Sequence, residues 1–180
     1  MKVIFLDFDG VLCNHASISA GYKARTAPEQ DPYGPHADCV AALNRIVEQA
    51  GARIVVSSTW RKCRNPNASM RETLKRWGVK SEVIGVTPCL ESRERELWVG
   101  VTRGTEIQRW LDTYSRHPVE SFVILDDDTD MGNLKHRLVR CDNVVGLTEA
   151  DADKAIAMLN APATDLMLDR MFREVGNLSS

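Results

Sequence analysis

Two carboxylates and a glycine follow the first apolar run of the sequence. Residues 3–6 are all apolar, Asp7 and Asp9 come directly after them, and Gly10 is next. A short apolar run predicts a buried strand, and a spacing of two along extended chain puts both carboxylates on one side. Two acids held close together repel each other unless a cation or a proton intervenes, so they do not stabilise a core. We therefore interpret this stretch as a site.

Two later apolar runs also end in polar residues. Residues 53–57 read R-I-V-V-S and continue into Ser58, and residues 122–125 read F-V-I-L and run into Asp126 and Asp127. In a parallel sheet the carboxyl ends of all strands lie at one edge, where ligands bind in open α/β folds. The sequence therefore predicts that these side chains converge with Asp7 and Asp9.

Several carboxylates at one edge favour Mg²⁺, a hard cation that prefers oxygen ligands and often also binds substrate phosphate. Beside such an ion, Asp7 is the predicted nucleophile toward phosphorus, and Asp9 is the predicted general acid and base. The Ser57 hydroxyl can bond a phosphoryl oxygen; Ser58 is the alternative. The remaining phosphate charge needs a cation, for which Arg103, at the start of a predicted helix, is the candidate.

Apolar strands alternating with amphipathic helices predict an α/β, Rossmann-like three-layer sandwich with a central, mostly parallel sheet. Further short strands are predicted at residues 82–86, 138–139 and 144–145, and residues 87–101 are interpreted as a solvated loop or an exposed helical turn. One helix is predicted at residues 37–50, and a second from 69 to 77, where Ser69 and Glu72 form a capping box. A third is predicted from residues 103–105 to before Pro118. A fourth follows a capping box of Thr148 and Asp151, and the last covers residues 166–175.

Composition bounds the function classes. The 180 residues are 43% hydrophobic, which fits a single domain over residues 1–180, and the net charge of −2 gives no global basic field for nucleic acid or membrane. Five widely spaced cysteines without a C-x-x-C pair indicate reduced thiols rather than a zinc site. The sequence shows no signal peptide and no segment long enough to span a bilayer, so we expect a cytoplasmic protein.

Three motifs resemble those of the haloacid dehalogenase (HAD) superfamily of phosphohydrolases. D-F-D-G-V-L from Asp7 resembles the first motif, V-V-S-S ending at Ser58 the second, and V-I-L-D-D-D ending at Asp128 the fourth. The third motif is a lone Lys or Arg, for which Arg103 fits best and Lys80 is the second choice. The resemblance covers residues 1–159, and a second aspartate two residues after the first is typical of phosphatases in this superfamily.

The resemblance implies a role for each matched residue. Asp7 would form an aspartyl-phosphate, and Asp9 would be the general acid and base. Mg²⁺ would be held by Asp7, Asp126 and the backbone carbonyl of Asp9. Asp127 would support that metal site, and Asp130 is the alternative second acid.

A narrower resemblance is to the HAD domains of RNA-repair proteins and to the phosphatase half of polynucleotide kinase-phosphatases. It rests on S-S-T-W-R, R-G-T-E-I-Q-R-W-L, I-L-D-D-D-T-D-M and G-L-T-E-A-D; no kinase motif G-x-x-x-x-G-K-[ST] is present. It implies a Mg²⁺-dependent phosphatase acting on DNA or RNA ends. A nucleotidase or small-metabolite phosphatase is the first alternative, and a catalytically silent HAD-fold binding module is the second.

Substrate access is predicted to be open. Residues 13–35 have the length of a flap, residues 61–102 are too few for a full cap domain, and residues 163–180 are predicted as a C-terminal helix and tail. Gly10, Ser58 and Arg61 are predicted to bind substrate. Further phosphate contacts and base stacking are predicted at loop residues, which are Lys23, Arg25, Lys62, Arg64, Trp60 and Tyr22. The oligomeric state and the polarity of the nucleic-acid end are not specified by the sequence.

Overall fold

The central element of the fold is a five-stranded sheet in which every neighbouring pair is parallel. The computed structural model describes residues 1–15, 17, 19, 34–94, 97–113 and 118–161. The sheet has the order β3-β2-β1-β6-β7. Its strands are β1 (Lys2–Leu6), β2 (Arg53–Val56), β3 (Val83–Val86), β6 (Ser121–Asp126) and β7 (Leu138–Arg140). The predicted α/β, Rossmann-like class is confirmed.

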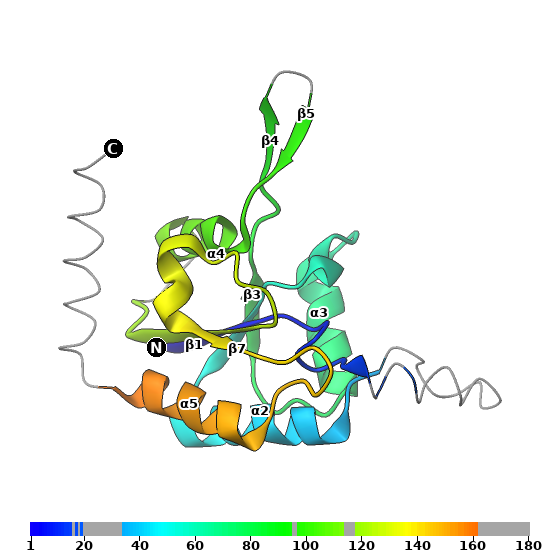
Figure 1. The fold of residues 1–180 in the computed structure, drawn as a ribbon, viewed down its shortest axis with the longest axis vertical. Helices are drawn as coiled ribbons and strands as arrows, with labels where there is room; N and C mark the ends of the chain where they lie inside the picture. Colours follow the sequence, from blue (N-terminus) through cyan, green and yellow to red (C-terminus); the bar gives the residue numbers. More distant parts are fainter. Residues whose placement is uncertain (16, 18, 20–33, 95–96, 114–117, 162–180) are drawn as a thin grey trace.

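Helices cover both faces of this sheet, as Figure 1 shows. On one face, Ile4 and Leu6 of β1 lie in a core with α2 (Ala37–Ala50), α3 (Pro66–Arg76) and α5 (Glu149–Asn160). On the other face, Val3 and Phe5 pack with α4 (Arg103–Thr113) and the 3₁₀ helix η2 (Gly132–Arg137). Because successive strand residues point to opposite faces, the uninterrupted apolar run of β1 is buried on both sides.

The register of the three central strands brings their polar ends together. Leu6 is paired with Val56 of β2 and with Leu125 of β6. The next residue along each strand is Asp7, Ser57 or Asp126, so these three residues lie side by side at one edge. The strand order also reverses at β1, which is the position where α/β sheets form a ligand-binding crevice.

Two predicted elements differ from the structure in kind. Residues 87–101 contain an antiparallel hairpin, β4 (Glu91–Glu94) and β5 (Leu97–Gly100), where the sequence favoured a loop or a helical turn. Figure 1 shows this hairpin projecting away from the sheet. Residues 144–145 lie in a turn closed by a bridge between Asp142 and Gly146, so the predicted short strand is wrong.

Of the two helix starts that were predicted from capping boxes, one is wrong and one is confirmed. Helix α3 begins at Pro66 rather than at Ser69, because the fixed φ of proline suits the first helical turn. The capping box of Thr148 and Asp151 at α5 is present as predicted.

Some predictions fall outside the described residues. These are most of the flap at residues 13–35, the C-terminal segment 163–180 with its helix at 166–175, and the loop residues Tyr22, Lys23 and Arg25. The single-domain division over residues 1–180 stays a prediction. Within the described ranges, none of the helices combines the length and apolar character that a bilayer crossing needs.

Candidate active site

Arg103 lies between two of the predicted site carboxylates. Its Nη2 atom is 3.5 Å from Asp7 Oδ2, and its Nε atom is 3.7 Å from Asp126 Oδ2. All three side chains are largely buried: the side chain of Arg103 is 14% exposed, that of Asp7 8% and that of Asp126 0%. The structure thus places Arg103, the predicted phosphate-binding cation, beside Asp7, the predicted nucleophile. The second choice, Lys80, is exposed and pairs with Glu48 at 2.8 Å.

The first turn of α4 fixes the backbone of Arg103. The Arg103 amide donates to Asp130 Oδ2 at 2.9 Å, and the Gly104 amide donates to the Asp130 carbonyl at 3.2 Å. A Cβ atom on Gly104 would lie 2.1 Å from the carbonyl oxygen of Met131, so only glycine allows this close approach. Asp130 therefore caps the helix that carries Arg103.

Asp127, rather than Asp130, joins the other two acids. One carboxylate oxygen from each of Asp7, Asp126 and Asp127 lies within 4.8 Å of the others, the one such group of acids found in the described part of the chain. Gly10 makes room for this arrangement: its φ is +71°, and a Cβ there would lie 2.4 Å from Asp127 Cγ. The glycine of the first motif thus serves the acid cluster through its lack of a side chain.

The electrostatics of these acids favour a bound cation. Burial, together with the charge of Asp7, raises the pKa of Asp126 to about 7. Burial is also the main cause of the raised pKa of Asp127, with the charge of Asp7 adding to it. A further positive charge beside them, in addition to that of Arg103, would favour their ionised form near neutral pH.

The donor set fits Mg²⁺. Asp126 Oδ2 is buried and has no hydrogen-bond partner, and a buried polar atom of this kind needs a partner. Asp7, Asp126 and Asp127 supply the carboxylate oxygens that Mg²⁺ prefers. These three residues would hold the ion; the predicted contribution of the Asp9 carbonyl stays a prediction.

Two potential phosphate donors lie beside the acids. Ser57 Oγ and Arg103 Nη1 are both buried without a hydrogen-bond partner. By contrast, Ser58 Oγ accepts a hydrogen bond from the Trp60 amide at 3.4 Å and caps the short 3₁₀ helix η1 (Thr59–Arg61). Of the two serines, Ser57 therefore fits the phosphate-binding role better.

Asp9 lies at the more exposed side of the site and is bonded to Trp60. The Trp60 indole Nε1 donates to Asp9 Oδ2 at 2.9 Å, and its ring packs edge-on against Phe8 and Trp77. Desolvation raises the pKa of Asp9, the bond from Trp60 lowers it, and the charge of Asp7 raises it again. Trp60 thus orients the predicted general acid, whereas the sequence had suggested that it stacks on a base.

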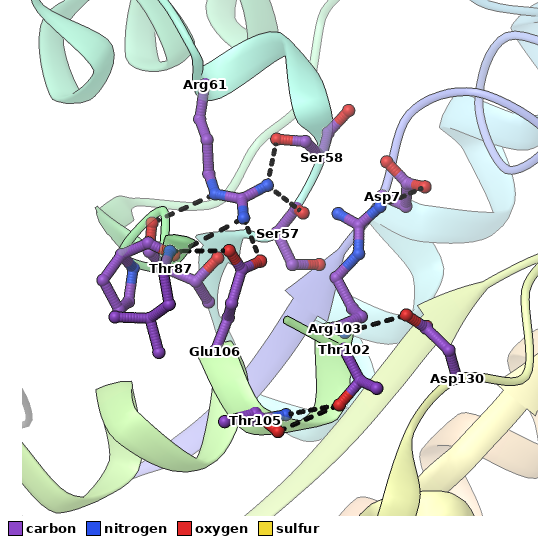
Figure 2. Close-up of polar contacts among 12 residues, drawn as sticks. Asp7, Ser57, Ser58, Arg61, Thr87, Thr102, Arg103, Thr105, Glu106 and Asp130 are labelled. Atoms are coloured by element: carbon purple, nitrogen blue, oxygen red, sulfur yellow. Dashed lines mark hydrogen bonds and ion pairs between the residues drawn. The ribbon is translucent and has the colours of Figure 1, made fainter. Parts of the chain in front are cut away.

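Arg61 does not fit its predicted role in binding substrate. It is only 3% exposed, and its guanidinium bonds to four backbone carbonyls and to Glu106. Figure 2 shows these contacts beside Ser57 and Arg103. Lys62 and Arg64, which follow it, are exposed, and their predicted phosphate contacts stay predictions.

The sequence reasoning missed Glu106 altogether. This glutamate is 7% exposed, pairs with Arg61 and accepts from the Leu90 amide at 3.0 Å. Its spacing of three from Arg103 was an available signal, since residues three apart on a helix share a face. Only the fold, however, brings Arg61 to it.

One of three comparisons with known proteins finds a family for this chain. Neither the curated proteins nor the solved structures contain a match to the chain. One family model matches residues 3–152 and is described as the HAD domain in Swiss Army Knife RNA repair proteins. The matched residues include the three strand ends that form the acid site, together with the helix that carries Arg103. The chain therefore belongs to the family of HAD domains found in Swiss Army Knife RNA repair proteins.

Proposed function

We propose that this protein is a Mg²⁺-dependent phosphomonoesterase that works through an aspartyl-phosphate and acts on the phosphorylated ends of nucleic acids. The observation that carries the chemistry is the position of Asp7. Its carboxylate lies 3.5 Å from the Arg103 guanidinium and within 4.8 Å of Asp126 and Asp127, at the edge where Ser57 Oγ is unpartnered.

In the first step, a carboxylate oxygen of Asp7 attacks the phosphorus. A new oxygen–phosphorus bond forms to Asp7 while the bond to the leaving oxygen breaks. Asp9, protonated, gives its proton to that oxygen, so the leaving group departs as a neutral alcohol. The raised pKa of Asp9 keeps a larger fraction of its carboxyl protonated for this purpose.

In the second step, water attacks the same phosphorus. Asp9, now ionised, takes the proton of the attacking water, and the bond between phosphorus and Asp7 breaks. Inorganic phosphate leaves, Asp7 returns as a carboxylate, and Asp9 regains its proton. One phosphomonoester and one water thus give one alcohol and one phosphate.

Ser57 and Arg103 bind the transferring group. The Ser57 hydroxyl and the free Nη1 of Arg103 can donate to its non-bridging oxygens, where charge develops. Mg²⁺, when bound, neutralises charge on the phosphoryl oxygens and on the site carboxylates. Asp127 would supply a third carboxylate, beside those of Asp7 and Asp126, to hold the ion.

The proposed substrate class rests on the family and on the site rim. The matching family model is described by its occurrence in RNA repair proteins. At the rim, Asp9 is exposed, and exposed Lys62 and Arg64 follow η1 from the same strand end that carries Ser57. Basic side chains at this position suit the phosphodiester next to a terminal phosphate.

A phosphate-release screen tests the proposal. Wild-type protein would be assayed with Mg²⁺ on RNA and DNA oligonucleotides carrying a 3′- or a 5′-phosphate, on nucleoside monophosphates and on sugar phosphates. Asp7→Asn is expected to abolish release. Asp38→Asn is the matched control, because this carboxylate is 92% exposed on α2 and touches none of the site residues.

The panel separates the alternatives. Release from phosphorylated oligonucleotides above that from nucleoside monophosphates supports end processing, and the reverse order supports a nucleotidase. Phosphate release from none of the substrates would contradict the phosphatase and favour a binding module. Activity of Asp7→Asn equal to wild type would contradict the assignment of the nucleophile.

A further inference from the structure

A buried arginine–glutamate pair is hydrogen-bonded to the segment that contains Ser57. Arg61 and Glu106 are 3% and 7% exposed, and Arg61 Nη2 bonds directly to a Glu106 carboxylate oxygen. Neither residue contacts Asp7, Asp126 or Asp127 through any interaction found in the described part of the chain. The pair is therefore adjacent to the proposed chemistry without taking part in it.

Arg61 fixes the two peptide groups that follow β2. Its Nη1 donates to the carbonyl of Ser57 at 2.5 Å and to the carbonyl of Ser58 at 2.6 Å. The carbonyl and the amide of a planar trans peptide point in opposite directions. Holding both carbonyls toward Arg61 therefore turns the amides of Ser58 and Thr59 away from it.

The site lies on the side of Ser57 that is away from Arg61. In Figure 2, Ser57 stands between Arg61 on one side and Arg103 with Asp7 on the other. The Ser57 hydroxyl, buried and unpartnered, belongs to the same segment. The guanidinium of Arg61 thus fixes this segment from the side that faces away from Arg103 and Asp7.

Glu106 connects the same guanidinium to α4. It lies three residues after Arg103, so both side chains project from one face of the first helical turns. Through the ion pair, the segment at Ser57 and the helix that carries Arg103 are held at a fixed separation. These are the two elements that must contact one phosphoryl group together.

The pair also fixes the segment that leads into the β4–β5 hairpin. Arg61 Nε donates to the Thr87 carbonyl at 3.1 Å, and Glu106 Oε1 accepts from the Leu90 amide at 3.0 Å. Three segments far apart in the sequence thus meet at one buried charge pair, as Figure 2 shows.

We propose that Arg61 and Glu106 are positioning residues that hold Ser57 and Arg103 in the geometry required to bind the phosphoryl group. This inference rests on the proposed function and adds two residues to its site. Stability alone is a weak reason for such a pair, because buried ion pairs can often be replaced by apolar residues without loss of stability. A misplacement of about 1 Å at a reacting centre, by contrast, can lower the rate about 10²-fold.

The test compares Glu106→Gln and Arg61→Lys with wild type at a temperature where circular dichroism shows each protein fully folded. Glu106→Gln is nearly isosteric and keeps an acceptor for Leu90, so it remains informative if Arg61→Lys does not fold. Binding of inorganic phosphate with Mg²⁺, binding of Mg²⁺ alone, and kcat/KM for p-nitrophenyl phosphate are measured. Arg45→Lys, in an exposed pair with Glu149 and Asp153, is the matched control.

Positioning predicts a specific pattern. Phosphate affinity should fall at least about 10-fold and kcat/KM about 10²-fold, whereas Mg²⁺ affinity should change less than about 2-fold, because the acid cluster is untouched. Arg45→Lys should match wild type in all three measurements. Folded Glu106→Gln with wild-type phosphate affinity and kcat/KM would overturn the inference, even if its melting temperature fell. Wild-type protein that neither binds nor releases phosphate would instead contradict the proposed function.

Discussion

Asp126 is a fully buried carboxyl group of the site, and its negative form is disfavoured both by burial and by the nearby charge of Asp7. Its carboxyl is 0% exposed, one of its oxygens accepts from the Asp128 amide at 3.0 Å, and the other has no hydrogen-bond partner. Burial and the charge of Asp7 raise its pKa to about 7, while Arg103 and the Asp128 amide act in the opposite direction. Without a bound metal ion, ionising Asp126 at neutral pH therefore carries an electrostatic cost.

This cost predicts a pH dependence of stability in EDTA. The folded-state pKa of Asp126 lies above its ordinary value of 3.8, so the folded state binds more protons between these two values. The free energy of unfolding should therefore fall as pH rises from about 4 to about 7, with Asp126 contributing about 2–4 kcal/mol. Urea unfolding at a series of pH values measures it.

Asp126→Asn provides the comparison. This variant should lose the Asp126 share of the pH dependence, and Mg²⁺ should stabilise wild type at pH 7.5 more than it stabilises the variant. The same pH slope in wild type and variant, with equal stabilisation by Mg²⁺, would contradict the assigned role of Asp126.

Trp60 is predicted to tune Asp9. The hydrogen bond from its indole lowers the pKa of Asp9, so Trp60→Phe should raise that pKa and move the descending limb of kcat/KM to higher pH. The rate at neutral pH should also fall about 10-fold, because Asp9 loses its orienting partner. Trp77→Phe is the matched control: the ring lies in the same cluster, but its Nε1 makes no hydrogen bond. A similar pH shift in both variants would contradict this role.

At the scale of single residues, the charged side chains of the site could be predicted from the sequence. Asp7 and Asp126 follow apolar strands, so their burial at a sheet edge could be read from the pattern. Arg61 and Glu106 could not be assigned in this way, because only the fold brings them to each other and to the segment of Thr87 and Leu90.

At the scale of elements, the first turn of α4 determines the position of Arg103 in the site. Asp130 caps this turn, and Gly104 packs against the backbone of Met131. The turn has no room to move toward η2, so its position is set by backbone contact rather than by a flexible side chain.

Gly104→Ala tests this packing. The new Cβ would overlap the Met131 carbonyl at 2.1 Å, so α4 must shift and carry Arg103 with it. We expect a loss of about 1–3 kcal/mol in the free energy of unfolding and about 10²-fold in kcat/KM. Gly78→Ala controls for stability: its φ of +79° makes alanine unfavourable, but no atom lies within 4 Å of the new Cβ. Equal activity in both variants at a temperature where they are folded would contradict this role of α4.

Element types were predictable where the hydrophobic period was strong. The strands β1, β2 and β6 and the helices α2 and α4 follow their apolar patterns. The hairpin at residues 91–100 was missed because its first strand reads E-S-R-E, which lacks the alternation typical of a half-buried strand. The start of α3 was misplaced because a local capping pattern at Ser69 competes with Pro66.

At the scale of the whole molecule, the sequence predicted a parallel sheet but not its strand order. The order follows from crossover connections on both faces, and it brings β6 next to β1 although more than 110 residues separate them in the chain. The convergence of three strand ends was therefore an expectation until the register placed Asp7 beside Ser57 and Asp126.

Net charge predicts how nucleic-acid substrates bind. The chain carries −2 overall, so contacts to phosphodiesters should be few and confined to the rim of the site. The slope of log(1/KM) against log salt for a phosphorylated oligonucleotide should therefore be shallower than about −2, equivalent to fewer than about three phosphate contacts. Steady-state kinetics at several potassium chloride concentrations measures it. A much steeper slope would indicate an extended basic track.

The central claim is that Asp7 becomes phosphorylated during turnover. Wild type and Asp9→Asn would be mixed with substrate and Mg²⁺, quenched in acid within the first turnover, and digested for mass spectrometry. The account predicts one phosphoryl group on Asp7, accumulating more in Asp9→Asn because that variant lacks the base for hydrolysis. Turnover without a phosphoryl group on Asp7, or with the group on another residue, would contradict it.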